Sequence, residues 1–581
     1  MKQTKPLFLI RKYRSILRAT LIVEAVNYIV SLTDSIVAGN LIGGTALAAI
    51  GLIAPFMTIS VFAASIIESG TIKNYSYHIG CFDEKRAREF FSQGLFLAVL
   101  TGVLYAGLLF VLRDFIVTRL TTDVEMQQYA REYFTIILLM FLLNPLANLL
   151  DNMTVADGGE KLSAAANVVF IISNVLLSFL FARFWGVRGI AVASVVSNVL
   201  FIALISLHLL GKTNTLRLLR HWSNRDGMTI LRSGIVMAST YALDALTVFA
   251  VNLFVSRFFD SNTLILLVMV EQFMGLLAVF IGMSMAAQPL IGTLNGERNN
   301  KALRALMKTV SASLVTAGLL LTGLTLLFTP YLVRAFGIAE QPLLSQGVIA
   351  LRIVSATLVL HAILALFFVY YYLMDRQKLA FALCVFKNVI SPLLLAVLLS
   401  VITGKQIGMW IGLAAAPVLS VLSYGLVIYL RCVKSRREGF PLLLPEGGDE
   451  HTYIYDFDIT TENAVDMART ADGTLDRYAV TKRTRVLASL FVEEMLMLIL
   501  EKNPDTKVSA ECTIIVEPTG IRLILRDSGK IFDITDEDSL VDSFRQYVIS
   551  NLMVAHDSKA YLTTTGYNRN ELFFPENVSG V

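Results

Sequence analysis

The sequence is poor in charge and in cysteine for its length. Of its 581 residues only 16% are charged, 55% are hydrophobic, and the mean hydropathy is +0.65. This balance lies far from the average of water-soluble domains, which excludes a protein that is soluble along its whole length. The four cysteines are scattered and form no Cys-x-x-Cys pair, which argues against a disulfide framework and against a zinc site.

Long apolar runs occupy the first three quarters of the chain, and an ordinary soluble composition follows from about residue 438. A helix needs about 20 apolar residues to cross the roughly 30 Å hydrocarbon core of a bilayer. The basic start of the chain is followed by no small-residue cleavage site, so we expect it to lead into the first span and not to be a signal peptide. The runs predict twelve transmembrane helices, at residues 15–38, 46–72, 91–113, 131–152, 162–184, 188–210, 230–257, 262–292, 307–330, 346–374, 379–402 and 406–431.

Charge is distributed unevenly between the two parts. Residues from Glu438 onward hold 25 acidic and 13 basic side chains, whereas the part before them holds 20 acidic and 36 basic ones. The basic residues of the membrane part gather in alternate loops. The positive-inside rule therefore places the N-terminus and the C-terminal part in the cytoplasm, and an even number of spans agrees with this.

The membrane part also repeats itself. The segment GCFDEKRAR from Gly80 aligns with GERNNKALR from Gly296, and Lys161-Leu162 aligns with Lys378-Leu379, at offsets of about 216 to 217 residues. Two six-helix halves in parallel orientation enclose a central cavity, as transporters use. The domains we expect are an N-lobe at 1–228, a C-lobe at 229–437, a linker at 438–451 and a soluble domain at 452–581.

Acidic residues inside the predicted spans are candidate functional sites, because a charge in hydrocarbon is costly. In the first span Glu24, Asn27, Ser31 and Asp34 follow spacings of three and four, which places them on one face of a helix. Asp34 is the stronger candidate for proton or cation exchange, since Glu24 lies near the cytoplasmic end and could pair with a loop arginine. Further candidates are Glu68, Asp244 and Glu271, of which Glu68 and Glu271 could equally serve packing. His361 fits a hydrogen-bonded histidine of the bundle better than a proton carrier.

Three segments, at 33–56, 80–91 and 285–309, resemble the multidrug and toxic compound extrusion (MATE) transporters. The resemblance covers residues 15–435. It implies two six-helix lobes that form a V, and export of an organic, often cationic or amphipathic, solute driven by a proton or sodium gradient.

The resemblance also assigns residues to the coupling site. The family's first-span Asp corresponds to Asp34, its fifth-span Asn to Asn174 and its sixth-span hydroxyl to Ser194. The acid that many members carry four positions after this Asn is Ser178 here, which weakens the case for a proton site of the usual kind. A seventh-span acid falls on Asp244, and the tenth-span acid has no equivalent near His361. The predicted transport residues are Asp34, Asn174, Ser194, Asp244, Glu24 and Glu271, with no catalytic residue and no metal ligand.

The soluble domain is predicted to be an α/β sandwich. Its order of elements resembles the ATP-binding domain of the histidine-kinase-type (GHKL) superfamily, especially the anti-sigma-factor serine kinases. The resemblance assigns the general-base Glu to Glu494 and a D-x-G-x-x-F nucleotide segment to Asp527, Gly529 and Phe532. The expected elements are a strand at 452–459, a helix at 482–500, a hairpin through Pro518-Thr519-Gly520, a helix at 541–555 and a hairpin at 561–574.

Two departures from that superfamily predict a domain without catalysis. The Asn that would hold Mg²⁺ is Leu498, and the segment at the position of the phosphate lid, 542–552, contains no glycine. Backbone N–H groups cradle phosphate only where side chains do not obstruct them. ATPase or kinase activity is therefore not expected, whereas binding of ATP or ADP stays open.

The sequence thus predicts a secondary active exporter, an antiporter and not an enzyme, coupled to H⁺ or Na⁺ and carrying a regulatory domain like a nucleotide-binding one. Two alternatives remain: a membrane sensor whose tail acts as an anti-sigma-type switch, and a flippase of a lipid-linked substrate. We expect a monomer in the bacterial plasma (inner) membrane, with both termini cytoplasmic. The expected partners are a small-molecule substrate, the lipid bilayer and a soluble cytoplasmic partner of the tail, but no nucleic acid.

Overall fold

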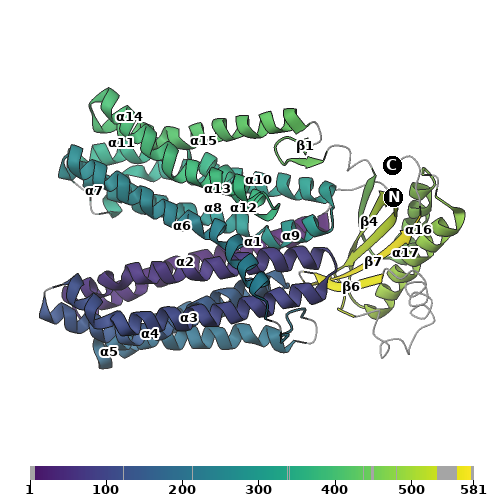
Figure 1. Ribbon diagram of the computed structural model, residues 1–581, viewed down its shortest axis with the longest axis horizontal. Coiled ribbons are helices and arrows are strands. Elements are labelled where there is room, and N and C mark those ends of the chain that lie inside the picture. The colour runs from purple at the N-terminus through teal and green to yellow at the C-terminus, as the bar shows by residue number, and fades with distance from the viewer. Residues whose placement is uncertain are drawn as a thin grey trace.

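The computed structural model describes residues 7–121, 123–211, 214–220, 222–336, 338, 340–435, 438–445, 451–478, 480–532, 559–564 and 566–576. Within these ranges, no side chain is described for residues 24–36. Figure 1 shows a long bundle of helices in two groups, and a small domain of strands and helices at one end of the bundle. We call the small domain the tail, and this end of the bundle the tail-bearing end.

The two groups of helices follow each other along the chain, and we call them the N-lobe and the C-lobe. The N-lobe holds α1 Leu7–Leu41, α2 Gly44–Gly80, α3 Glu84–Leu120, α4 Val124–Ala156 and α5 Glu160–Ser206, with the short turn η1 Leu207–Leu210. The C-lobe holds α6 Asn224–Phe258, α7 Ser261–Met274, η2 Gly275–Leu277, α8 Ala278–Met285, α9 Gln288–Gly296, α10 Asn300–Ala335, α11 Leu343–Ser355, α12 Leu358–Leu373, α13 Gln377–Val385, η3 Phe386–Ile390, α14 Ser391–Thr403 and α15 Gln406–Ser435.

The number of membrane passes can be compared with the predicted twelve. In the described part of the chain, nine helices are long and apolar enough to cross a membrane, and the bent pair α11–α12 makes a tenth if it is one span. The 35-residue helix α1 is not among them. One candidate span, Glu160–Leu210, is 51 residues long, which is far more than one crossing requires. If α1 and a second arm of α5 also cross, the number of passes equals the prediction.

Helix α5 does turn back on itself, at Gly186. This glycine has φ 56° and ψ −134°, a conformation outside the helical region that glycine adopts without a steric penalty. Asn174 Nδ2 donates a hydrogen bond to Ser194 Oγ at 3.0 Å. In one continuous helix those residues would lie about 30 Å apart. A side-chain carbon at Gly189 would meet the carbonyl oxygen of Phe181 at 2.2 Å, so the two arms touch beside the turn.

The two loops that the sequence aligns have the same conformation. Phe82, before α3, has φ 58°, and Arg298, before α10, has φ 57°. The next residues, Asp83 and Asn299, each cap the following helix by accepting a hydrogen bond from the backbone nitrogen three residues later, at 3.1 and 3.0 Å. These αL residues and caps lie about 216 residues apart, in corresponding places of the two lobes.

The lobes meet at the tail-bearing end, where α2 packs against α9. A side-chain carbon on Gly296 would lie 2.7 Å from the Cα of Gly80, so the two backbones approach as closely as only glycine allows. Beside this contact Lys73 Nζ, on α2, lies 2.6 Å from Asp375 Oδ1, just after α12. We call this contact between the lobes the seam.

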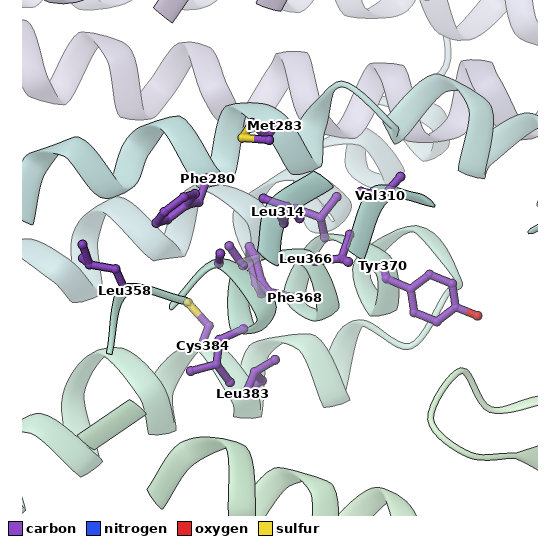
Figure 2. Packing of buried hydrophobic residues seen from close by; sticks show 14 of the residues in the cluster. Phe280, Met283, Val310, Leu314, Leu358, Leu366, Phe368, Tyr370, Leu383 and Cys384 are labelled. Atoms are coloured by element: carbon purple, nitrogen blue, oxygen red, sulfur yellow. The ribbon is translucent and has the colours of Figure 1, made fainter. Parts of the chain in front are cut away.

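The C-lobe has its own core, which joins α8, α10, α12 and α13. Figure 2 shows Phe280, Leu314, Phe368 and Leu383, one from each of these helices, packed together and shielded from the surface. Because lipid tails are as apolar as these side chains, such a core stabilises the lobe in a bilayer mainly through close packing.

The tail is an antiparallel sheet with two helices on one face. Its strand order is β3-β4-β5-β7-β6, and each neighbouring pair is antiparallel. The predicted strands and the long helix are present, but α16 was not expected from the sequence because its stripe is built largely from alanine. The predicted helix at 541–555 lies outside the described residues. The bounds are β3 Thr452–Asp458, α16 Thr461–Leu475, α17 Lys482–Lys502, β4 Ser509–Glu517, β5 Gly520–Asp527, β6 Lys559–Thr564 and β7 Tyr567–Pro575.

The beginning of the predicted linker is packed against the C-lobe as a small hairpin. The hydroxyls of Tyr370 and Tyr371 donate to the backbone carbonyls of Leu442 and Pro441 at 2.9 and 2.8 Å. Leu443 is buried in the C-lobe core. The C-lobe therefore holds the root of the tail. The two strands of this hairpin are β1 Glu438–Gly439 and β2 Leu444–Pro445.

The seam predicts the effect of one added methyl group. Gly296→Ala would place its Cβ 2.3 Å from the carbonyl oxygen of Tyr77, so α2 and α9 must move apart. Overpacking of this kind costs about 1–3 kcal/mol. We expect a lower apparent melting temperature of the purified protein. The matched control is Gly107→Ala on α3, where nothing lies within 4 Å of the new carbon. Equal melting temperatures of the two variants would contradict the close contact.

Candidate functional site

A cavity of about 630 Å³ lies inside the bundle, between the two lobes. Its lining comes mostly from α1, α2, α4 and α5, and residues of α6, α8 and α9 close it from the C-lobe side. Volumes of a few hundred Å³ are usual for small-molecule sites. The polar side chains of its N-lobe wall include Asn144, Asn148, Asp151, Asn167, Asn174 and Asn198.

Helix α4 supplies a ladder of amides to this wall. Asn144, Asn148 and Asn152 are spaced by four residues, so they share one face of the helix. Asn144 Nδ2 donates to Ser60 Oγ of α2 at 3.4 Å, and Asn148 Nδ2 donates to Asn144 Oδ1 at 3.4 Å. The sequence analysis did not predict this ladder, because it considered no uncharged polar residue of the fourth span. An Asn repeat of period four in an apolar span would have revealed it.

Asp151, on the same helix, is the carboxylate that the cavity shows most plainly. Its side chain is 8% exposed, and it accepts hydrogen bonds from Ser163 Oγ at 2.5 Å and from Asn167 Nδ2 at 3.1 Å. Both donors come from the first arm of α5. The sequence analysis did not single out Asp151, since it falls at the very end of a predicted span, where an acid is easily taken for a loop residue.

The structure brings together two of the predicted coupling residues, Asn174 and Ser194. Both line the cavity, and Asn174 is fully buried. Its amide nitrogen is bonded to Ser194, whereas its Oδ1 has no hydrogen-bond partner among the described residues. Ser178 lies one turn further along α5 and is fully buried, and its hydroxyl too has no partner within the described part. Buried oxygens left in this way are costly unless something binds them.

Of the acidic residues predicted in the first two helices, the structure describes the side chain of only one. The side chains of Glu24 and Asp34 lie outside the described residues, although the backbone at both positions belongs to α1. Glu68, on α2, is 8% exposed and lines the cavity. Of the acids predicted in the first two spans, Glu68 is thus the one that the structure places at the cavity.

Asp244 lies on α6 in the C-lobe and, unlike Asn174 and Ser194, is not among the residues that line the cavity. It is exposed, and its electrostatic partner is Lys387. Lys387 stands in η3, a short π-helical turn inside the span α13–α14, and contacts Asn388 Oδ1. π-Helical turns often mark functional positions. The sequence analysis missed Lys387, although a single lysine within an apolar run is a recognisable signal.

Glu271 and His361 have local partners of their own. Glu271 accepts two contacts from Asn252 Nδ2, at 2.9 and 2.8 Å, which join α7 to α6. Asn252 lies eight residues beyond Asp244 on α6, or about 12 Å along the helix, so Glu271 is separate from that acid. His361 Nδ1 lies 3.2 Å from the carbonyl oxygen of Thr357, four residues earlier. The six predicted transport residues therefore do not form one site.

In the tail, Asp527 ends β5 on the face that carries α16 and α17. Its Oδ1 accepts hydrogen bonds from Gly529 N and from Asn568 Nδ2, both at 2.9 Å. Its Oδ2 has no partner within the described residues, and the same is true of the amide of the neighbouring Asn570, which is 1% exposed. Burial raises the pKa of Asp527 to about 6. These buried, unpartnered groups have the chemistry to bind an amino group and a ring nitrogen.

The other predicted nucleotide residues surround this point only in part. Phe532 N donates to Asn568 Oδ1 at 3.3 Å, which ties the D-x-G-x-x-F segment to β7. Glu494 is partly buried on α17, and Leu498, one turn later, is buried in the tail's core. A leucine offers no oxygen for Mg²⁺, which prefers oxygen ligands. The lid segment 542–552 lies outside the described residues.

The architecture of the membrane part defines a class: a helical bundle of two lobes around a central polar cavity, which is a transporter fold and not an enzyme fold. Comparison with known proteins gives the fold family. Residues 19–180 match the family model MatE. No curated relative matches the sequence.

Solved structures extend the likeness to both lobes. A crystal structure of MATE in complex with MaL6 has a TM-score of 0.68 at 20% identity, over 75% of this chain and 98% of that one. A MOP superfamily transporter from Pyrococcus furiosus, described as having a binding pocket of reverse polarity, has a TM-score of 0.67 at 21% identity, over 75% of this chain and 100% of that one. An outward-facing multidrug resistance MATE family transporter also has a TM-score of 0.67 at 21% identity, over 75% of this chain and 100% of that one. The membrane part therefore has the MATE transporter fold.

Asp527 predicts a pH dependence of the tail's stability. Its pKa is about 6 in the folded tail, against an ordinary value of 3.8, so the folded state binds the proton more tightly. Protonated Asp527 therefore contributes about 3 kcal/mol to the free energy of unfolding of the tail at low pH. This contribution is lost as the pH rises from about 4 to about 6. Asp527→Asn should remove that loss. Hydrogen exchange of β4 and β5 amides in the full-length protein, read at pH 5 and pH 7, measures it.

The control for this comparison is Asp505→Asn, because Asp505 is exposed in the turn after α17. It should leave the difference between the two pH values as in the wild type. Equal pH dependence in wild type and Asp527→Asn would show that the buried carboxyl does not carry the effect.

Proposed function

We propose that this protein is a secondary active exporter of an organic, cationic or amphipathic solute, driven by a proton or sodium gradient. The observation that supports this most is the cavity between the lobes, with buried Asp151 and a wall of amides. Two carboxylates, Asp151 and Glu68, in an otherwise uncharged polar wall favour a cation, and the amides offer hydrogen bonds to many ligand shapes. The orientation we propose places the tail in the cytoplasm of a bacterium.

The proposed coupling site is the N-lobe set Asp34, Asn174 and Ser194. The Oδ1 of Asn174 supports it, because this buried amide oxygen has no partner among the described residues and suits a hard cation such as Na⁺. Asp34 would supply the charge. Since Ser178 cannot titrate, we propose that the exchange of a proton or cation at this set depends on Asp34.

A second ion site at Asp244 receives less support. A lysine is its electrostatic partner, and a bound cation would have to compete with that ammonium group. We propose that Asp244 and Lys387 balance each other's charge within the C-lobe, and that the N-lobe is where the coupling ion binds.

The tail is proposed to regulate transport and not to drive it. Asp527 and Asn570 keep the chemistry for an adenine-like base, so weak binding of ATP or ADP is consistent with the structure. Leu498 supplies no ligand for Mg²⁺, which supports the absence of hydrolysis. A tail without catalysis fits a transporter that is powered by an ion gradient.

Asp34→Asn should abolish gradient-driven efflux, because the amide can neither release a proton nor balance a bound cation. The measurement is efflux of a fluorescent organic cation from proteoliposomes under an imposed proton or sodium gradient. Ser178→Ala serves as the control and should transport like the wild type. Normal efflux by a folded Asp34→Asn variant would contradict the coupling site.

Asp151→Asn should change substrate preference and leave coupling intact. Loss of one negative charge at the cavity wall should raise KM for an organic cation about tenfold, equal to ~1.4 kcal/mol, and leave KM for a neutral analogue of the same shape unchanged. Ser163→Ala is the matched variant, since it removes one hydrogen bond but keeps the charge. An equal rise in KM for the cation and the neutral analogue would show that Asp151 shapes the cavity without recognising charge.

A further inference from the structure

The sheet of the tail has two unlike faces. One is apolar and packs against α16 and α17 through residues such as Leu523 and Leu572. The other carries a charged cluster from three adjacent strands. Arg526 pairs with Glu511 on the neighbouring strand at 2.5 Å. Arg526 and Glu511 are at most 3% exposed. Another part of the chain therefore covers this polar face of the sheet. The remaining members of the cluster are Arg569 and Glu571 of β7.

The part that covers this face includes the α9–α10 loop of the C-lobe. Glu297, in this loop, is 1% exposed and forms an ion pair with Arg526. Its other carboxylate oxygen lies 3.0 Å from Arg569 Nε. Two arginines from the tail thus neutralise one buried carboxylate of the membrane part.

Arg569 also reaches the N-lobe. Its Nη1 and Nη2 donate to the backbone carbonyls of Ile79 and Gly80, both at 2.9 Å. These carbonyls end α2, where the helix dipole is negative and favours a cation. The guanidinium carbon lies 3.5 Å from the centre of the Phe82 ring. A single side chain therefore binds the N-lobe loop after α2 and, through Glu297, the corresponding loop of the C-lobe.

Further contacts hold the tail to the N-lobe at α1. Phe8 N donates to Asp456 Oδ2 at 2.5 Å, and Arg11 forms an ion pair with the same carboxylate at 3.2 Å. The rings of Phe8 and Tyr567 lie 4.3 Å apart, centre to centre. Because the hairpin β1–β2 roots the tail in the C-lobe, these contacts make the tail a strap from one lobe to the other.

The strap lies over the seam. The Gly80–Gly296 contact is next to the carbonyls and the carboxylate that Arg569 binds. The hydroxyl of Tyr372, in the C-lobe, also crosses the seam and donates to the carbonyl of Ser69 in the N-lobe at 2.8 Å. Alternating access moves one lobe against the other, so the seam must separate when the cavity opens at this end. The present contacts of Arg569 cannot all survive that movement.

We propose that the tail is a clamp: docked on both lobes it holds the seam shut, and its release from one lobe permits opening at the tail-bearing end. The proposal rests on the proposed function, since opening matters only to a transporter. The charged face of the tail can separate from the lobes, because water can hydrate its Arg and Glu side chains after release. Interfaces between domains that move are polar in the same way. Breaking one partner of a buried ion pair is strongly unfavourable, which gives Arg569 leverage over the docked state.

The test is the distance between the lobes at the tail-bearing end. Spin labels at Lys85→Cys and Lys308→Cys, both exposed and one in each lobe, report it in a background without the four native cysteines. With the wild-type clamp we expect the short distance to predominate over a minor longer one. With Arg569→Gln the ratio of a longer to the short distance should rise at least about tenfold. Arg522→Gln is the control, since Arg522 pairs with Glu517 and Glu571 inside the tail and should not alter the ratio.

A cross-link makes the test independent of how well Arg569→Gln folds. Phe8→Cys with Tyr567→Cys, joined by a short bifunctional reagent, should suppress the long distance and stop efflux, and a cleavable reagent should restore both. An unchanged distance distribution in the released and in the cross-linked protein would overturn the clamp. If distances shift as expected but neither wild type nor Arg569→Gln moves any solute, the clamp stands and the proposed function fails.

Discussion

The interior of a bilayer offers no hydrogen-bond partners, and this constraint decides where the polar side chains of the membrane part can lie. Asp151 is bonded by a hydroxyl and an amide from α5, and Asn174 is bonded to Ser194 across the α5 hairpin. On α4, Asn148 donates to the side chain of Asn144, and Asn152 donates to the backbone carbonyl of Asn148. Asn174 Oδ1, which finds no partner among the described residues, belongs to a side chain that lines the cavity, where a ligand or an ion can satisfy it.

The same constraint explains why charge reappears at the tail-bearing end. There the helices end, and Arg569 of the tail donates hydrogen bonds to the last carbonyls of α2, one of which, Ile79 O, also accepts from Phe82 N at 3.1 Å. Glu297 is held by two arginines of the same sheet. The tail thus completes the polar end of the membrane bundle, and it does so at the seam between the two lobes.

The sequence predicts the parts of this structure that depend on local pattern. Apolar runs locate the helices, and the turn at Pro518-Thr519-Gly520 correctly separates β4 from β5. Asn174 and Ser194 were each assigned to the coupling site by resemblance, and the structure joins them by a hydrogen bond of 3.0 Å. What could not be predicted depends on tertiary packing. Glu297, Arg526 and Arg569 look like ordinary solvated charges in the sequence, because their burial arises only when the tail meets both lobes. Asp151 lies at the end of a predicted span, where an acid resembles a loop residue, and Lys387 is a single lysine in an apolar run.

The central claim is that an ion gradient moves a solute through the cavity between the lobes. Efflux of an organic cation from proteoliposomes, with proton and sodium gradients imposed separately and then dissipated by ionophores, tests it most directly. The account predicts efflux with one of the two gradients, in the absence of ATP, and its loss when that gradient collapses. Efflux that persists after both gradients are dissipated, or that requires ATP hydrolysis, would contradict it.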